Sequence, residues 1–271
     1  CSPNEYWSGN KQSQDEFGEV EAVAKAMSAL GANVRLRPFD VQKHRAPGRD
    51  RITVETMVRN ESIEWIRSCG FSHILIVDGD ELWKTGTLKI VDKAITATGC
   101  DTVTLRMVPV IGYPGLPIDN AKDRVTVYIG PAVKYRECRC AFGSNSDVEY
   151  FGVFHFTATR KTVSEIVEKH RQSGHYDDPS YDFEGWIANT LPNIKVGSTN
   201  VHMYIPYQIW PSVRTWTKQE LAHIPDAIKQ HLNTRDVSSI DLSKPATQQG
   251  VRKASKLAFS RLAPSNGYKS V

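Results

Sequence analysis

The sequence predicts an α/β protein with a mixed, mainly parallel sheet flanked by helices and a C-terminal helical extension. The first observation is the short apolar run Ile74–Val77, which is bounded by turn signals and is typical of a strand buried on both faces. The second is the helical spacing of apolar residues over 51–69, a stretch that ends at Gly70. The third is a further helical stretch over 87–98, closed by Gly99. Helix, strand and helix in this order form half of a βαβ unit.

The other elements follow from periodicity and turn residues. Thr162 and Glu165 form a capping box that opens a helix. Helices are expected at 17–30, 162–171 and 179–191, and strands at 32–39, 101–110, 124–135, 150–159 and 200–205. A chain of 271 residues with 40% hydrophobic content can bury one large core or two modest ones. We therefore expect an α/β domain at 1–210 and a helical, basic extension at 211–271.

The composition indicates the compartment in which the protein works. The sequence contains no run of 18 apolar residues and no signal peptide, which favours a soluble, cytoplasmic protein without a transmembrane segment. The five cysteines lack disulfide or zinc-finger spacing and are expected to be reduced.

The C-terminal part of the chain is basic. No acidic residue follows Asp241, whereas six lysines and arginines do. Apolar residues in Gly250–Leu262 recur on one helical face, which indicates an amphipathic basic helix. This helix either docks on the core through its apolar face or contacts an anionic acceptor such as nucleic acid or lipid headgroups.

An acidic turn follows the predicted buried strand. Asp78, Asp80 and Glu81 lie within four positions, directly after Val77. Ligands bind at the carboxyl ends of parallel strands, and neighbouring carboxylates that stay ionised usually need a cation. Oxygen ligands favour Mg²⁺, Mn²⁺ or Ca²⁺. The turn therefore predicts a divalent-metal site, with a plain solvated Asp-Gly turn as the alternative.

These motifs resemble the donor half of GT-A glycosyltransferases, above all the inverting family 2. Val58-Arg59-Asn60 precedes the segment from Gly70 to Glu81 as that family's Arg-Asn pair precedes its DXD strand. The resemblance implies a GT-A, Rossmann-like fold and donor contacts from Arg59, Asn60 and Asp78. It also implies a DXD-bound Mn²⁺ or Mg²⁺ held by Asp78 and Asp80. A UDP-sugar is the expected donor.

The resemblance continues to about residue 205. Asp182-Phe183-Glu184-Gly185-Trp186 is similar to the family's acidic motif, which implies that Asp182 is the catalytic base. Val201-His202-Met203 is similar to the strand that carries a late metal-binding histidine, which implies His202 as a third ligand. The pattern of His155, Lys169 and His175 is similar to family 17 N-acetylglucosaminyltransferases, and it leaves His155 as an alternative ligand.

The chemistry of sugar transfer is consistent with these roles. Negative charge grows on the departing diphosphate, and a metal can act on it as a Lewis acid. A carboxylate such as Asp182 can take the proton of an acceptor hydroxyl, although Asp is also a preferred helix N-cap. The acceptor is expected to be a glycan, a small molecule or a nucleic acid bound by the basic C-terminal segment.

Three other classes of protein stay open. A metal-dependent phosphohydrolase also uses Asp-x-Asp after a strand, but Leu82 stands where Thr or Val is expected. A sugar nucleotidyltransferase needs a Gly-rich basic loop near its N-terminus, which this sequence lacks. A carbohydrate-binding protein would use the late aromatic residues, which are Trp186, Tyr204, Tyr207, Trp210 and Trp216.

Overall fold

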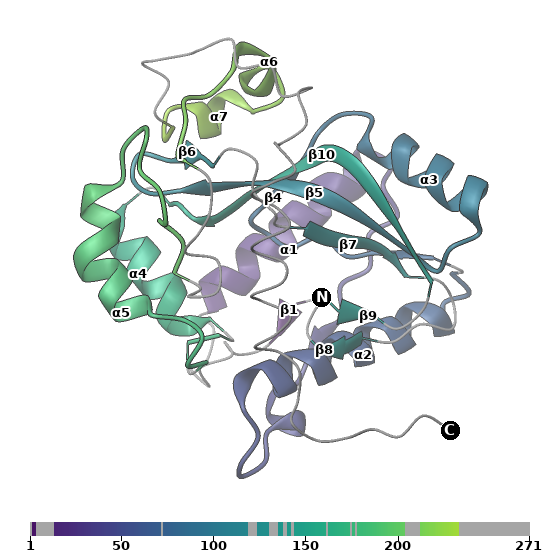
Figure 1. Cartoon of the computed structure of the whole chain (residues 1–271). Helices are drawn as coiled ribbons and strands as arrows, with labels where there is room; N and C mark the ends of the chain where they lie inside the picture. The colour runs from purple at the N-terminus through teal and green to yellow at the C-terminus, as the bar shows by residue number, and fades with distance from the viewer. Residues whose placement is uncertain are drawn as a thin grey trace, which may run out of the picture.

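The computed structural model describes residues 2–3, 14–71, 73–118, 124–129, 135–137, 140–141, 144–160, 162–173, 175–176, 178–203 and 212–232. These residues form a mixed sheet flanked by helices (Figure 1), which confirms the predicted α/β class. The helices are α1 Gln14–Ala29, α2 Arg51–Ser68, α3 Thr87–Thr98, α4 Val163–Gln172, α5 Phe183–Gly185, α6 Lys218–Leu221 and α7 Asp226–Lys229. The strands are β1 Ser2–Pro3, β2 Pro38–Phe39, β3 Ile74–Leu75, β4 Glu81–Trp83, β5 Thr102–Ile111, β6 Leu116–Pro117, β7 Arg124–Ile129, β8 Tyr135–Glu137, β9 Cys140–Ala141 and β10 Asn145–Ala158.

The main sheet has the order β3-β7-β5-β10-β4, with β6 paired to β5. Only β5 and β10 run parallel among its described pairs, and the other neighbours are antiparallel. The sheet is therefore mixed, as predicted, but it is mainly antiparallel and not mainly parallel. After β5 the chain passes through β6 and returns beside β5 as β7. A return of this kind gives antiparallel neighbours, whereas parallel pairing needs a longer crossover.

Strand β5 forms the centre of the core. Successive side chains of a strand point to opposite faces, and both faces of β5 are covered. Met107 packs in a cluster with Val91 of α3, and Val108 packs in another with Trp216. The predicted central strand at Ile74–Val77 is instead the short edge strand β3, and the side chain of Val77 is 50% exposed.

The predicted helices agree with the structure better than the predicted strands do. Helices α1, α2 and α3 end within one residue of expectation, and α4 begins after Thr162, whose side chain accepts from the Glu165 backbone N–H at 3.2 Å. The strand expected at 32–39 is only β2, paired with β1. No strand forms over the described part of 200–205, which is 200–203. The helix expected at 179–191 is α5 followed by a π-helical turn and a 3₁₀ turn.

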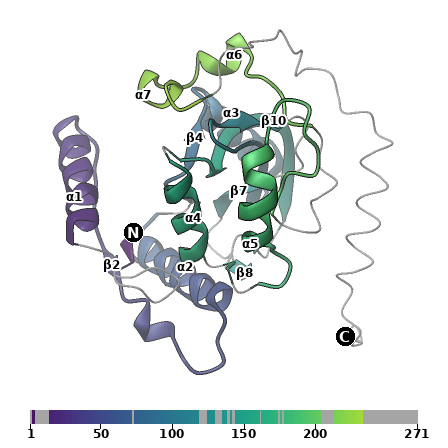
Figure 2. The same cartoon turned by 90° about the vertical axis from the view of Figure 1, so that its left-hand side faces the viewer.

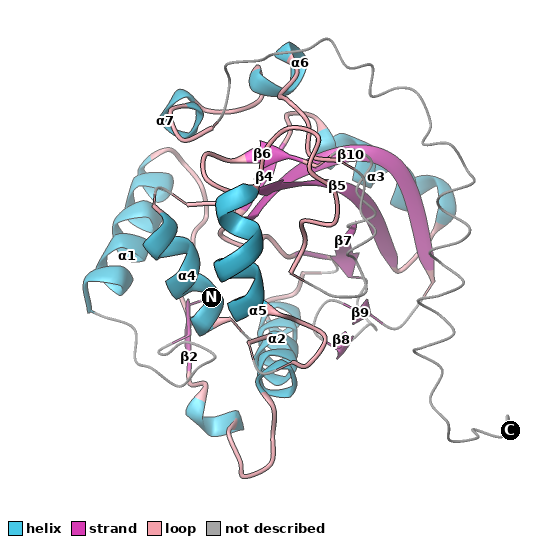
Figure 3. Ribbon diagram, turned by 60° about the vertical axis from the view of Figure 1, so that its left-hand side comes forward, coloured by secondary structure: helices cyan, strands magenta, loops and turns pink. Residues whose placement is uncertain are grey.

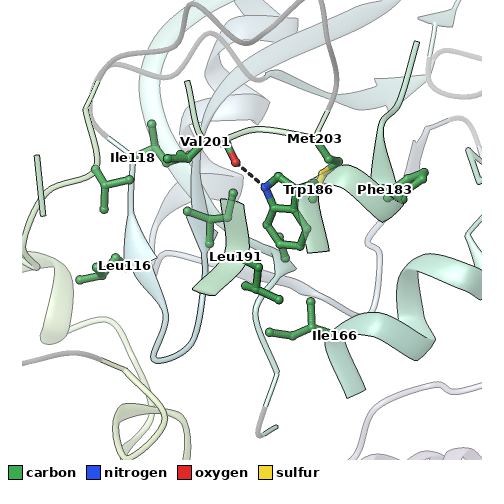
Figure 4. Close-up of a cluster of buried hydrophobic side chains, with 11 residues drawn as sticks. Leu116, Ile118, Ile166, Phe183, Trp186, Leu191, Val201 and Met203 are labelled. Carbon is green, nitrogen blue, oxygen red and sulfur yellow. Dashed lines mark hydrogen bonds between the residues drawn. The ribbon is translucent and has the colours of Figure 1, made fainter. Parts of the chain in front are cut away.

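A second core lies where β5 and β10 end. Ile111 of β5 and Ala158 of β10 pack in one cluster with side chains from α4 and α5. Figure 4 shows Ile166 of α4 and Phe183 of α5 in this cluster. The indole N–H of Trp186 donates to the carbonyl of Val201 at 2.6 Å. This core holds α4, α5 and residues 201–203 together, and α4 and α5 lie side by side in Figures 2 and 3. Helix α1 stands apart from the sheet in Figure 2.

Residues 212–232 pack on the sheet. Trp216 is fully buried against Phe154 of β10, and its indole N–H donates to the Gly115 carbonyl at 3.0 Å. Arg214 and Glu220 form a buried ion pair nearby, at 2.7 Å. The predicted basic helix Gly250–Leu262 lies outside the described residues. Within the described part of the chain, no helix has the length and apolar character that crossing a membrane requires.

Candidate functional site

The acidic turn joins the two edge strands of the main sheet. It follows β3, at one end of the strand order, and leads into β4, at the other end. The carboxylate of Glu81 accepts hydrogen bonds from the Asp78 backbone N–H and the Trp83 indole N–H, both at 3.3 Å. The backbone N–H of Phe156 in β10 donates to the Asp80 carbonyl at 2.8 Å. The turn is therefore fixed at both ends, and its aspartates face different neighbours.

Asp78 is paired with Arg59. The guanidinium of Arg59, on α2, contacts both carboxylate oxygens of Asp78 at 3.2 Å. The Nε–H of Arg59 donates to Glu55 at 2.9 Å, one helical turn earlier. Asn60 follows on the same helix and is half-buried. The structure thus brings together two of the three predicted donor-binding residues, Arg59 and Asp78.

Asp80 is surrounded by basic side chains. Its Oδ2 lies 2.5 Å from the Lys169 ammonium, 3.7 Å from His155 Nε2 and 3.9 Å from the Arg160 guanidinium. The side chain of Asp80 is 14% exposed. Burial raises the pKa of this carboxyl, but the charges of Lys169, His155 and Arg160 outweigh burial and lower its pKa to about 2. Asp80 is therefore ionised at neutral pH.

The basic residues come from two elements. His155 lies on β10, where it pairs in register with Glu81, and Arg160 follows the end of β10. Lys169 lies on α4. The guanidinium of Arg160 donates to the backbone carbonyls of Phe156 and Thr159, both at 2.6 Å, and burial lowers its pKa. These backbone bonds fix the orientation of Arg160 beside Asp80.

His202 is buried, and its charge acts on His170. The neighbouring His170, on α4, is also buried and packs on the rings of Phe183 and Trp186 at 5.0 and 5.4 Å. Burial, together with the charges of Lys169, Arg160 and His202, lowers the pKa of His170 to about 3. His202 therefore lies within electrostatic range of His170.

The described residues contain no group of three or more His, Cys, Asp or Glu side chains that could hold a metal ion. Asp78, Asp80 and His202, the predicted ligands, are accordingly not gathered into one such group. Asp78 faces Arg59, and Asp80 faces Lys169. Neither ion pair could be predicted from the sequence, because the basic partner of each aspartate lies on a different element, far away along the chain.

Asp182 is the N-cap of α5. Its carboxylate accepts from the Gly185 backbone N–H at 2.9 Å, and its own N–H donates to the Met203 carbonyl at 3.1 Å. Tyr181 and Phe183 stack on each other beside it, with ring centroids 5.1 Å apart. The capping alternative of the sequence analysis is confirmed. A carboxylate that accepts one backbone hydrogen bond keeps further acceptor sites for a proton.

Two site residues were missed from the sequence. Arg160 belongs to no motif that the sequence analysis recognised. It does directly follow a predicted apolar strand, and a charged residue at such a position is a signal that could have identified it. Glu55 stands four residues before Arg59, and this spacing on a helix is a usable signal for an ion pair. Lys169 was noted only through the family 17 pattern, and the structure places its ammonium 2.5 Å from Asp80 Oδ2.

Comparison of the chain with protein-family models, curated proteins and solved structures found no match. The function is therefore argued from the chemistry of the residues around the acidic turn.

Proposed function

We propose that this protein is a glycosyltransferase of GT-A type that moves a sugar from a nucleotide diphosphate donor to an acceptor hydroxyl. A UDP-sugar is the donor we favour, and an inverting transfer fits a separate carboxylate base. The observation that carries the proposal is the acidic turn itself. It holds Asp80 ionised beside basic side chains and Asp78 in a bidentate pair with Arg59, on the one segment that connects β3 to β4.

The residues suit a diphosphate and a divalent cation. A metal ligand must be deprotonated, and Asp80 meets this condition because its pKa is about 2. Asp80, Asp78 and His202, which the described structure does not gather into one group, would have to converge to hold Mn²⁺ or Mg²⁺, and His155 is the alternative nitrogen ligand. When bound, such an ion withdraws charge from the diphosphate as a Lewis acid. Arg59 and Asn60, on α2, would orient the donor beside Asp78.

Asp182 is the proposed general base. It lies at the start of α5, on the segment that the core cluster attaches to residues 201–203. Its carboxylate would accept the proton of the acceptor hydroxyl while the hydroxyl oxygen bonds to the anomeric carbon. An acceptor screen would identify whether a glycan, a small molecule or a nucleic acid supplies this hydroxyl. The protein used in the screen retains the basic C-terminal segment.

A nucleotide-sugar panel tests the proposal. Thermal unfolding is measured with each nucleotide sugar, with and without Mn²⁺, because a ligand that binds the native state raises the melting temperature. We expect one donor to stabilise the protein and then to be hydrolysed slowly without an acceptor, releasing nucleoside diphosphate. The Asp80→Asn variant is the control. Equal stabilisation and hydrolysis in wild type and variant would end the glycosyltransferase proposal.

A metal-dependent phosphohydrolase is the second candidate. The basic side chains around Asp80 also suit a phosphate monoester, which is the observation that favours it. The products separate the two reactions, since a phosphohydrolase releases inorganic phosphate and a glycosyltransferase releases nucleoside diphosphate. Formation of a nucleotide sugar from a nucleoside triphosphate would instead indicate a nucleotidyltransferase. Sugar binding without turnover would indicate a carbohydrate-binding protein.

A further inference from the structure

Lys169, Arg160 and His155 converge on one carboxylate oxygen. All three approach Asp80 Oδ2, at 2.5, 3.9 and 3.7 Å. Lys169 arrives from α4, whereas the other two arrive from β10 and the residues just after it. Residues from two elements therefore meet at the middle of the acidic turn.

The cations outnumber the buried carboxylate that they face. Lys169 and Arg160 are both cationic, and among the described residues Asp80 is the buried carboxylate that both approach. Glu165 also acts on Arg160, but its side chain is exposed, so solvent screens it. Holding excess positive charge in a partly buried position costs free energy. Two cations beside one buried carboxylate form an arrangement that a bound anion would stabilise.

Arg160 is already oriented for a ligand. Two backbone carbonyls hold its guanidinium, which would otherwise sample many rotamers. An arginine fixed in this way loses less conformational entropy when it binds an anion. Phosphate oxygens accept especially strong hydrogen bonds from charged donors such as the guanidinium N–H groups of Arg160 and the ammonium of Lys169.

We propose that Lys169, Arg160 and His155 form a binding site for the diphosphate of the donor, in which Lys169 exchanges Asp80 for a phosphate oxygen. The inference rests on the proposed function. As the bond between the anomeric carbon and the phosphate oxygen breaks, its electron pair stays on the diphosphate. Lys169 and Arg160 then stabilise that charge, while the proton of the acceptor hydroxyl passes to Asp182. These side chains thus stabilise the leaving group alongside a metal.

Inorganic pyrophosphate in the presence of EDTA is the probe. Its affinity is measured by isothermal titration calorimetry on the whole chain, without sugar, acceptor or divalent metal. Wild type is expected to bind pyrophosphate. Lys169→Met should weaken binding about tenfold or more, because a charge-assisted hydrogen bond is lost. Lys169→Arg keeps the charge and should retain most of the affinity.

The Asp80→Asn variant gives the sharpest expectation. Under this proposal the Asp80 carboxylate competes with phosphate for Lys169, so its removal should tighten pyrophosphate binding in EDTA. The double variant Asp80→Asn, Lys169→Met removes both charges of the pair, so neither is left buried without the other. It can therefore be measured even if Lys169→Met alone fails to fold. It should bind as weakly as Lys169→Met. Lys229→Met is the matched control, because it removes a surface lysine–aspartate pair away from the site.

The outcomes separate this inference from the proposed function. Absence of pyrophosphate binding to wild type in EDTA overturns it, as does unchanged affinity in the double variant. If no nucleotide sugar is hydrolysed but pyrophosphate binding still requires Lys169, the anion site stands and the glycosyltransferase proposal falls. If a donor is hydrolysed and the Lys169 variants bind pyrophosphate normally, only the anion site is wrong.

Discussion

Arg59 and Asp78 are joined by a bidentate ion pair, with the guanidinium of α2 3.2 Å from both oxygens of the carboxylate. Arg59 also contacts the buried carboxylate of Glu55 at 2.9 Å. One guanidinium therefore holds the acidic turn to α2. This arrangement fixes Asp78 in position before any ligand binds.

Arg59→Lys is expected to weaken donor binding and lower the melting temperature by a few degrees. A lysine keeps the charge but cannot contact two carboxylates with a planar fork. Arg59→Met should destabilise more strongly, by about 3 kcal/mol, because Glu55 is then a buried charge without its partner. Urea unfolding measures the stability, and donor titration measures the affinity. Arg37→Lys, which changes a partly exposed pair with Glu61, is the control.

Because of Asp80, the free energy of unfolding is expected to fall as the pH is lowered from about 4 toward 2. Its folded-state pKa of about 2 lies below the ordinary value of 3.8, so the unfolded chain binds its proton first as the pH falls. The stabilisation is complete above pH 4 and is lost as the pH falls toward 2, and it amounts to about 2 kcal/mol. Urea unfolding of wild type and Asp80→Asn across this range should show the difference narrowing at low pH.

Asp226→Asn is the control for this pH dependence. Asp226 also pairs with a lysine, Lys229, at 2.8 Å, but its carboxylate is exposed to solvent. Exposed pairs contribute little to stability, so the variant should follow wild type. A difference between Asp80→Asn and wild type that stays constant from pH 5 to pH 2 would contradict the assigned pKa.

Two substitutions at Asp182 separate a base from a helix cap. Asparagine caps a helix about as well as aspartate, so Asp182→Asn should keep the melting temperature and lower turnover by about 10² to 10⁴. Asp182→Ala should lower turnover equally and also cost about 1 kcal/mol of stability. Asp50→Asn changes the N-cap of α2, where Asp50 accepts from Thr53, and should leave turnover unchanged. Full turnover by Asp182→Asn would leave Asp182 as a cap only.

The buried Arg214–Glu220 pair should make residues 212–232 essential to the stability of the sheet. Both side chains are less than 10% exposed, and Glu220 also accepts from the Thr217 backbone and hydroxyl. Arg214→Met leaves Glu220 charged and buried, which is expected to cost about 3–5 kcal/mol. Adding Glu220→Gln should recover much of this loss, and a urea double-mutant cycle measures the coupling. Additive effects of the two substitutions would contradict the pairing.

The sequence by itself determined the helices and the position of the acidic turn. The pattern over 51–69 and the glycine after it predicted α2, because helical periodicity and caps are local signals. Gly70 and Gly99 both have positive φ, 85° and 61°, as helix-ending glycines do. The Asp78–Glu81 turn was also predicted where it occurs, after an apolar strand, although the unpredicted strand β4 stands between it and α3.

Only the tertiary structure decided the sheet order and the partners of the two aspartates. An apolar run such as Ile74–Val77 shows that a segment is buried, but not which strand it pairs with, and β3 proved to be at an edge. Arg59 is 19 residues from Asp78, and Lys169 is 89 residues from Asp80. No periodic signal connects residues that far apart, because strand pairing and helix docking bring them together only when the chain folds.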